Sequence, residues 1–400
     1  MGLFSILNGP VRRTKTIQID STLGNVLLCG NSEKGFESIM CNYSIDTVNK
    51  GYGLIVIRDQ STGISTYPKI TPYNRDIYSV DCVENSSSNQ IDIFSSMSEN
   101  DINNYIIKIF DMYNEIDRSK KMNFLTYISL LRTLCKKAGR KVKLNNLYEI
   151  SIEDVEDMNY RFTTSPMEKS KNDRFLSSIR NDISLLESYF FDFSQNIIGN
   201  VFSGNRSIED LIKLKPILEI NLDFSSRKDE SQLILSILVD AINRCNMLKT
   251  TKQQINIIVD GAPNDVLIES GLQKVIKSGK PINLLFSVQD ISNLVEQSNE
   301  WIDYADSYFF FRQTSNKNKE FCSELFGTYE KKKETVTKST NRPTFWSAMS
   351  GNSSSSKNTG TSYTYEKERV YTPELFANLA NNESIYYSKR RNEHMKLIVY

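Results

Sequence analysis

The feature that most constrains the fold is a pattern of strand, turn, helix and strand near the N-terminus. Asn25–Cys29 is a short apolar run, and the turn-like segment Gly30–Gly35 follows it. Residues 36–49 carry apolar side chains at helical spacing, and Gly53–Ile57 is a second apolar run. Two buried strands joined through a helix run parallel and need cover on both faces of their sheet. The pattern therefore predicts an α/β domain.

The same alternation returns in the second half of the chain. Apolar runs predict strands, and helical patterns separate them; the strands are expected at 77–83, 217–222, 255–260, 282–288 and 308–311, and the helices at 229–248, 264–278 and 290–298. Strands and helices that alternate so regularly are typical of a doubly wound, mainly parallel sheet.

A long helical stretch interrupts this alternation. Helical spacing of apolar residues is found at 99–116, 121–138, 151–163 and 172–197. We therefore expect an N-terminal segment at 1–20, a core made of 21–83 and 215–400, and a helical insertion at 84–214. Ser, Thr, Asn and Gly enrichment predicts a flexible loop at 336–363. Thr372-Pro373-Glu374-Leu375 is typical of a helix start.

Composition limits the kinds of site and partner. The 400 residues carry a formal charge of +1, which argues against a protein that coats nucleic acid by bulk charge. His394 is the only histidine, so a metal site built on several imidazoles is excluded. Six cysteines without a CxxC pair indicate reduced thiols, and no apolar run approaches the ~20 residues of a spanning helix. We expect a cytoplasmic protein.

The ordered set of segments resembles the FtsK–HerA superfamily of ring-forming DNA pumps, especially the TraG/TraD-like coupling proteins of conjugation and type IV secretion. The resemblance runs from near Leu23 to about Tyr387. The segments that carry it are the loop Gly30–Gly35, Ile91–Phe94 at the entry to the helical insertion, Ile257–Asp260 at the Walker B position, Phe286–Gln289 at the glutamine-bearing strand end, and the late landmarks Phe321–Gly327 and Tyr371–Leu375. The resemblance implies a RecA-like P-loop NTPase core.

The first loop departs from the pattern that ATP chemistry requires. A working loop reads GxxxxGK[ST], in which backbone N–H groups and the lysine bind phosphates and the hydroxyl binds magnesium. The matching residues are Gly30, Asn31, Ser32, Glu33, Lys34 and Gly35. Phe36 then stands at the lysine position and Glu37 at the hydroxyl position. We expect lost catalysis, although Lys34 could compensate if the backbone rearranged; read without its neighbours, the segment is an ordinary strand-to-helix turn.

Three further residues match family positions. Asp260 stands at the Walker B aspartate that would hold magnesium, but Gly261 replaces the acidic residue after it. Gln289 matches a position that couples the nucleotide site to the neighbouring strand, and Arg312 matches an arginine finger. The alternatives are that Asp260 and Gln289 cap the helices that follow them and that Arg312 lies at a surface or interface.

The losses at 36 and 261 predict a pseudo-ATPase that acts as a structural or interaction subunit of a DNA or protein translocation assembly, with no cofactor. The alternative is an active ATP- and Mg-dependent translocase with a remodelled loop; a nucleotide-binding switch without turnover lies between them. Expected partners are related ATPase or secretion-complex subunits in a homo- or hetero-oligomer, with association at the inner face of the membrane through a partner.

DNA is a further possible partner. Three basic clusters could contact phosphate or could simply be solvated faces: Arg12-Arg13-Thr14-Lys15, Lys331-Lys332-Lys333 and Lys389-Arg390-Arg391.

Overall fold

The structure is a computed structural model of the whole chain. It describes residues 19–60, 76–82, 89–93, 98–113, 117–214, 216–245, 254–297, 300–340 and 357–399. The basic cluster at 12–15, and all but two residues of the expected N-terminal segment, lie outside these ranges. None of the helices in the described part of the chain is both long enough and apolar enough to cross a bilayer.

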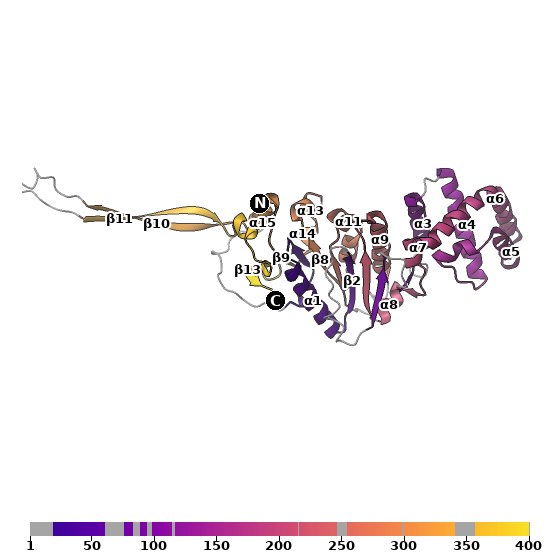
Figure 1. Ribbon diagram of the computed structural model, residues 1–400, viewed down its shortest axis with the longest axis horizontal. Coiled ribbons are helices and arrows are strands. Elements are labelled where there is room, and N and C mark those ends of the chain that lie inside the picture. The colour runs from indigo at the N-terminus through magenta and orange to yellow at the C-terminus, as the bar shows by residue number, and fades with distance from the viewer. Residues whose placement is uncertain are drawn as a thin grey trace, which may run out of the picture.

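A nine-stranded sheet forms the centre of the molecule, in the order β13-β12-β9-β1-β8-β7-β2-β6-β3 (Figure 1). All neighbours from β9 to β3 are parallel, whereas β12 is antiparallel to both β9 and β13. The strands are β1 Val26–Cys29, β2 Gly53–Asp59, β3 Ile77–Asp81, β6 Ile217–Leu222, β7 Ile255–Asp260, β8 Ile282–Val288, β9 Ser307–Phe310, β12 Glu383–Ser388 and β13 Glu393–Ile398. The predicted mainly parallel α/β sheet is confirmed.

Helices cover both faces of this sheet. Alternate residues of one strand enter different cores: Leu27 and Ile55 pack on one side, Val26 and Leu54 on the other. Helix α1 (Glu33–Asn49) covers the second side with Phe36, Ile39, Met40 and Tyr43. The opposite side is covered by α9 (Lys228–Arg244), α11 (Asn264–Glu269), α12 (Leu272–Lys277), α13 (Ile291–Gln297), α14 (Glu300–Tyr304) and α15 (Asn316–Phe326). Buried apolar side chains on both faces explain why the strands read as continuous apolar runs.

Between β3 and β6 the chain is mostly helical. The elements are α3 Glu99–Tyr113, α4 Arg118–Lys137, η3 Leu144–Glu149, α5 Ile152–Phe162, α6 Pro166–Gln195, α7 Ile197–Val201 and α8 Ile208–Leu214, with the short pair β4 Ile91–Asp92 and β5 Arg206–Ser207. They lie at one end of the molecule, beside the β3 edge of the sheet (Figure 1). The Tyr105 hydroxyl donates to Asp240, and Arg244 pairs with Asp101, so α3 is fastened to α9.

The structure differs from the sequence predictions in three places. The expected loop at 336–363 overlaps two strands, β10 (Thr328–Thr340) and β11 (Lys357–Arg369), and only its centre, 341–356, lies outside the described residues. The expected helix 264–278 is two helices, because Gly271 with φ of +79° interrupts it. Helix α1 begins at Glu33 and not at 36, since Ser32 caps it.

A short helix and the C-terminal strands complete the core. The expected helix start at Thr372 is confirmed: α17 spans Pro373–Ala377 with Thr372 as N-cap and proline in the first turn. Ser21–Leu23 forms the short helix η1 before β1.

Candidate functional site

The loop between β1 and α1 is short and closed on itself. Ser32 is the N-cap of α1, and its hydroxyl oxygen accepts a hydrogen bond from the backbone N–H of Gly35 at 3.0 Å. The N–H of Phe36 donates to the carbonyl of Ser32 at 3.0 Å. Because these two N–H groups belong to the helix cap, they are not directed at a ligand.

Neighbouring strand ends occupy the other side of the loop. The N–H of Gly30 donates to the Val288 carbonyl at 3.0 Å, and the N–H of Asn31 donates to the Arg312 carbonyl at 2.9 Å. Gly30 has φ of +108°, and a Cβ atom there would lie 2.7 Å from the Arg312 carbonyl oxygen. Glycine is required at position 30 by this close backbone approach, whether or not phosphate ever binds.

Side chains fill the remaining space against the loop. The Phe36 ring is 8% exposed and meets the Phe311 ring edge to face, with centroids 5.1 Å apart. A Cβ atom on Gly35 would lie 2.9 Å from Cδ1 of Phe311. The Ser32 hydroxyl also donates to the Asn381 carbonyl, from the segment before β12.

This geometry does not fit a bound triphosphate. Four loop N–H groups, those of Gly30, Asn31, Gly35 and Phe36, already donate to protein oxygens. A phosphate cradle needs such groups to point together at one anion. Lys34 is exposed on the first turn of α1, Glu37 is half-buried, and the side chain of Glu33 lies outside the described part of the structure.

Asp260 ends β7 in a buried polar pair. It is 4% exposed, and its Oδ1 accepts a hydrogen bond from the Ser287 hydroxyl at 2.8 Å. The same Ser287 oxygen accepts from the Gly261 N–H at 3.1 Å, which joins the ends of β7 and β8. The alternative that Asp260 caps the next helix is wrong, because α11 has Pro263 as N-cap and no side-chain cap hydrogen bond.

Gln289 follows β8 and is exposed. The alternative that it caps α13 is wrong as well, since Asp290 Oδ1 accepts from the Asn293 N–H at 2.9 Å. Strand β8 lies between β1 and β7, so the loop, Gln289 and Asp260 stand at the carboxyl ends of three adjacent strands. In the described residues, no group of three or more His, Cys, Asp or Glu side chains is arranged to hold a metal ion.

Arg312 follows β9 with its side chain exposed. Its backbone forms an isolated antiparallel bridge with Asn31, which ties the end of β9 to the loop. The residue thus closes the loop through its carbonyl and leaves its guanidinium on the surface.

The comparisons with known proteins agree with this topology. A family model described as the TraM recognition site of TraD and TraG matches residues 255–381. The bacterial conjugative coupling protein TrwB, in a trigonal form lacking its N-terminal 70 residues and bound to sulphate, is similar in fold at a TM-score of 0.52. The two chains are 14% identical over 94% of this chain and 84% of that one.

A second structure of the plasmid coupling protein TrwB, in complex with ADP and Mg2+, gives a TM-score of 0.51 at 14% identity, over 94% of this chain and 84% of that one. No curated protein matches the sequence. Residues 255–381 are therefore TraG/TraD-like. The whole chain has the RecA-like P-loop NTPase fold, and the expected resemblance to the TraG/TraD-like coupling proteins is confirmed.

The sequence analysis missed two residues that contact the loop. Gln313 is 2% exposed, and its Nε2 donates to the carbonyls of Cys29 at 3.2 Å and Phe311 at 3.0 Å. Its Oε1 is buried without a hydrogen-bond partner. Asn381 acts through its backbone carbonyl, which any residue carries. No sequence pattern predicts the contact of Gln313 with Cys29 or that of Asn381 with Ser32. Each joins two residues that are more than 280 positions apart in the sequence.

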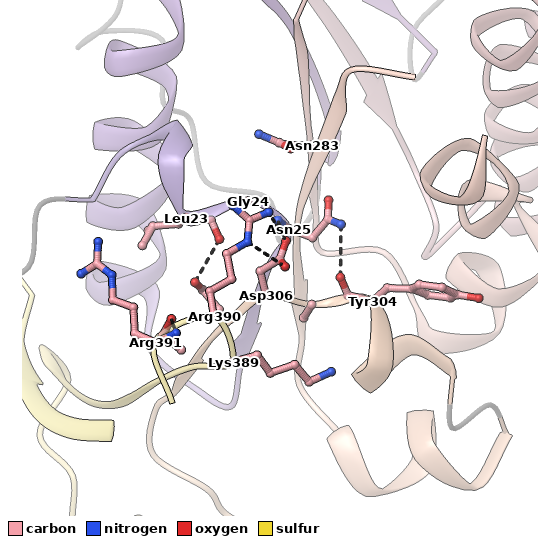
Figure 2. Close-up of polar contacts among 12 residues, drawn as sticks. Leu23, Gly24, Asn25, Asn283, Tyr304, Asp306, Lys389, Arg390 and Arg391 are labelled. Atoms are coloured by element: carbon pink, nitrogen blue, oxygen red, sulfur yellow. Dashed lines mark hydrogen bonds and ion pairs between the residues drawn. The ribbon is translucent and has the colours of Figure 1, made fainter. Parts of the chain in front are cut away.

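Two residues of the basic run Lys389-Arg390-Arg391, Lys389 and Arg390, lie near the opposite end of β1, and the Arg391 side chain points away from it (Figure 2). Arg390 pairs with Asp306 at 3.1 Å, and Asp306 accepts from the Asn25 N–H at 2.9 Å. The Lys389 ammonium donates to the carbonyls of Ile302 and Asp303, at 2.8 and 3.0 Å, and burial lowers its pKa. Lys389 and Arg390 therefore fasten the turn after β12 to the turn before β9.

Proposed function

We propose that this chain is a catalytically degenerate relative of the coupling-protein ATPases, acting as a structural or interaction subunit of a DNA or protein translocation assembly of the conjugation or type IV secretion kind. The observation that carries the proposal is the closed loop. Phe36 and Glu37 stand where lysine and a hydroxyl residue are needed, and four loop N–H groups donate to protein oxygens. Gly261 leaves Asp260 without the usual acidic neighbour.

In this proposal the RecA-like core comprises 21–83 and 215–400, and 84–214 is a helical insertion that meets a partner or substrate. Partners are related ATPase or secretion-complex subunits, and such a partner recruits the chain to the inner face of the membrane from the cytoplasm. The family matched by 255–381 is described by TraM recognition, which favours a protein-binding surface in that part of the chain.

The alternative is an active translocase that hydrolyses ATP with Mg. One observation favours it: Asp260, Gln289 and the loop keep adjacent places at the carboxyl edge of the sheet. The related TrwB structure with ADP and Mg2+ adds to it. Activity would require the contacts from Arg312, Phe311 and Asn381 to open and Lys34 to replace the missing lysine, with Arg312 as an arginine finger.

The test is ATP binding and hydrolysis by the purified chain, with Phe36→Lys/Glu37→Thr as the repaired variant. We expect neither binding nor turnover in the native chain. A rise in melting temperature with ATP and Mg, but no turnover, would indicate a nucleotide-binding switch. Turnover that Asp260→Ala abolishes would contradict the proposal and support the translocase.

A further inference from the structure

The strands β10 and β11 form a long ribbon that leaves the body of the molecule at the end opposite to α3–α6 (Figure 1). Thirteen residue pairs run antiparallel from Thr328↔Arg369 to Thr340↔Lys357. Within the described residues, neither strand pairs with a third. As far as the described strands go, the ribbon therefore has two open edges, each a row of backbone N–H and C=O groups available to another strand.

A two-stranded ribbon of this kind gains little stability from its own contacts. An isolated two-stranded hairpin is marginal in water, because it lacks a buried apolar face. Here Val336, Tyr363 and Tyr365 are 48%, 52% and 66% exposed. The register places all three on one face, since Val336 lies opposite Thr361 and side chains alternate along β11. A partner that extends the sheet would stabilise the ribbon and shelter this face.

We propose that the partner is a second copy of this chain, whose β10 edge pairs with the outer edge of β11 in the register that the ribbon already uses internally. The proposal deepens the assembly role proposed above by naming the surface through which copies meet. It commits to a head-to-tail contact, β11 of one copy beside β10 of the next.

Charge on the two strands supports this pairing. On one face of the ribbon, the charged residues of β11 are two acids, Glu366 and Glu368, and the charged residues of β10 are two bases, Lys331 and Lys333. Within the ribbon they form ion pairs, Lys331 with Glu368 at 3.0 Å and Lys333 with Glu366 at 3.2 Å. A neighbouring β10 at the outer edge of β11 brings the same lysines to the same carboxylates, each of which has acceptor capacity for a second cation.

Pairing of two β11 edges lacks this complementarity. Two β11 strands side by side would place Glu366 and Glu368 with no lysine on their face. On the other face, the β11 row carries the bases Lys357, Lys367 and Arg369 and no acid at all. Opposed like charges destabilise a sheet. The sequence of β11 is therefore suited to β10 and not to itself.

The geometry of this contact fixes how the copies are arranged. A neighbouring β10 antiparallel to β11 means that adjacent ribbons point the same way. Copies related in this way repeat one heterologous contact, which closes into a ring when the rotation permits. The ribbons then form one continuous sheet in which Val336, Tyr363 and Tyr365 of every copy line the same face.

Cysteine cross-linking tests the contact directly. Thr335 and Ser362 lie opposite each other in the ribbon, and both side chains are exposed. The six native cysteines are all buried, so an introduced thiol is the accessible one. Thr335→Cys and Ser362→Cys are made in separate chains, purified and mixed, then treated with a short thiol-specific bifunctional reagent.

We expect cross-linked dimers in the mixture and none in either variant alone. The double variant in one chain is the control, because its internal cross-link reports that the ribbon forms and that the positions are in reach. Dimers with Ser362→Cys alone, or with Thr335→Cys alone, would overturn the proposal in favour of pairing between two β11 edges or two β10 edges. No dimer in the mixture, with the internal cross-link intact, would also overturn it. The remaining alternative is that this face binds nucleic acid, and binding of a single-stranded oligonucleotide tests it. If the native chain binds the oligonucleotide, the Tyr363→Ala/Tyr365→Ala variant does not, and the mixture gives no cross-linked dimer, the face is assigned to nucleic acid. None of these readouts depends on ATP, so their failure is distinct from failure of the proposed function.

Discussion

At the scale of single residues, close packing around the loop between β1 and α1 explains its two glycines. The glycines at 30 and 35 are what a phosphate-binding pattern requires, and they drew attention to this loop in the sequence. In the structure, Arg312, Gln313 and Phe311 lie where their side chains would be. The same two glycines therefore serve a closed turn, and their presence does not by itself indicate nucleotide binding.

Gly30→Ala should destabilise the fold strongly. The substitution combines an unfavourable positive φ with a Cβ atom pressed against the Arg312 backbone, and we expect a loss of about 2–4 kcal/mol in the free energy of unfolding. Gly51→Ala is the matched control, because Gly51 has φ of +74° but no atom near its Cβ position; it should lose about 1 kcal/mol. Urea denaturation measures both, and equal losses would contradict the tight packing described for Gly30.

The single histidine predicts a pH dependence. His394 is half-buried, its Nδ1 lies 2.8 Å from the Tyr371 hydroxyl, and burial lowers its pKa below 6.5. Well above pH 6.5 the ring is neutral in both the folded and the unfolded chain and contributes no pH dependence. As pH falls through 6.5, the unfolded chain binds the proton more readily, so stability falls until the folded-state pKa is passed.

His394→Gln should remove this contribution of the histidine to the pH dependence of the free energy of unfolding between about pH 7 and 5.5. The measurement is the free energy of unfolding across that range for both proteins, where the native chain loses at most about 1.4 kcal/mol per pH unit from this group. Parallel pH profiles for the two proteins would contradict a depressed pKa of His394.

At the scale of elements, an aromatic cluster joins the last third of the chain to the sheet. Phe326 at the end of α15 meets Tyr371, Phe310 and His394 with ring centroids 4.9, 5.6 and 5.6 Å apart. These partners come from the turn before α17, from β9 and from β13. One ring therefore connects α15 to two strands of the sheet and to the turn before α17.

Phe326→Ala should cost about 3–5 kcal/mol in the free energy of unfolding, because it leaves a cavity among rings that cannot close around it. Tyr365→Ala is the comparison, since that ring is 66% exposed and its loss should change stability by less than about 0.5 kcal/mol. Thermal or urea unfolding distinguishes the two. A small effect at 326 would show that the cluster repacks.

Sequence patterns predicted the sheet well and the ribbon badly, for one physical reason. Strands such as β7 and β8 are buried on both faces and read as apolar runs, Ile255–Asp260 and Ile282–Val288. Strand β11 is exposed on both faces, and its Ser, Thr, Lys and Asn composition resembles a linker. For the site, the losses at Phe36 and Gly261 are visible in sequence. The closure by Phe311, Gln313 and Asn381 is not, because it depends on which strand ends meet.

At the scale of the whole molecule, the central sheet separates the helical region from the two-stranded ribbon. The helices α3–α6 lie at one end and the ribbon at the other, with the closed loop on the sheet between them (Figure 1). The chain enters the ribbon at Thr328 and leaves it at Arg369, and these two residues lie opposite each other. Removal of the ribbon therefore interrupts no strand of the central sheet, and its role can be separated from folding.

Replacing residues 332–365 by Asn-Gly leaves a short hairpin, because Lys331 lies opposite Glu366 and Asn-Gly favours the tight turn between them. We expect the shortened chain to keep its helical and strand content by circular dichroism and to melt within about 4 °C of the native chain. Those of the removed side chains that the structure describes are exposed and contribute little to the core. If copies meet through the ribbon edges, light scattering should report assembly by the native chain and a monomer after shortening. A shortened chain that unfolds would contradict the separation of ribbon from core, and one that still assembles would assign the contact to the sheet or to α3–α6.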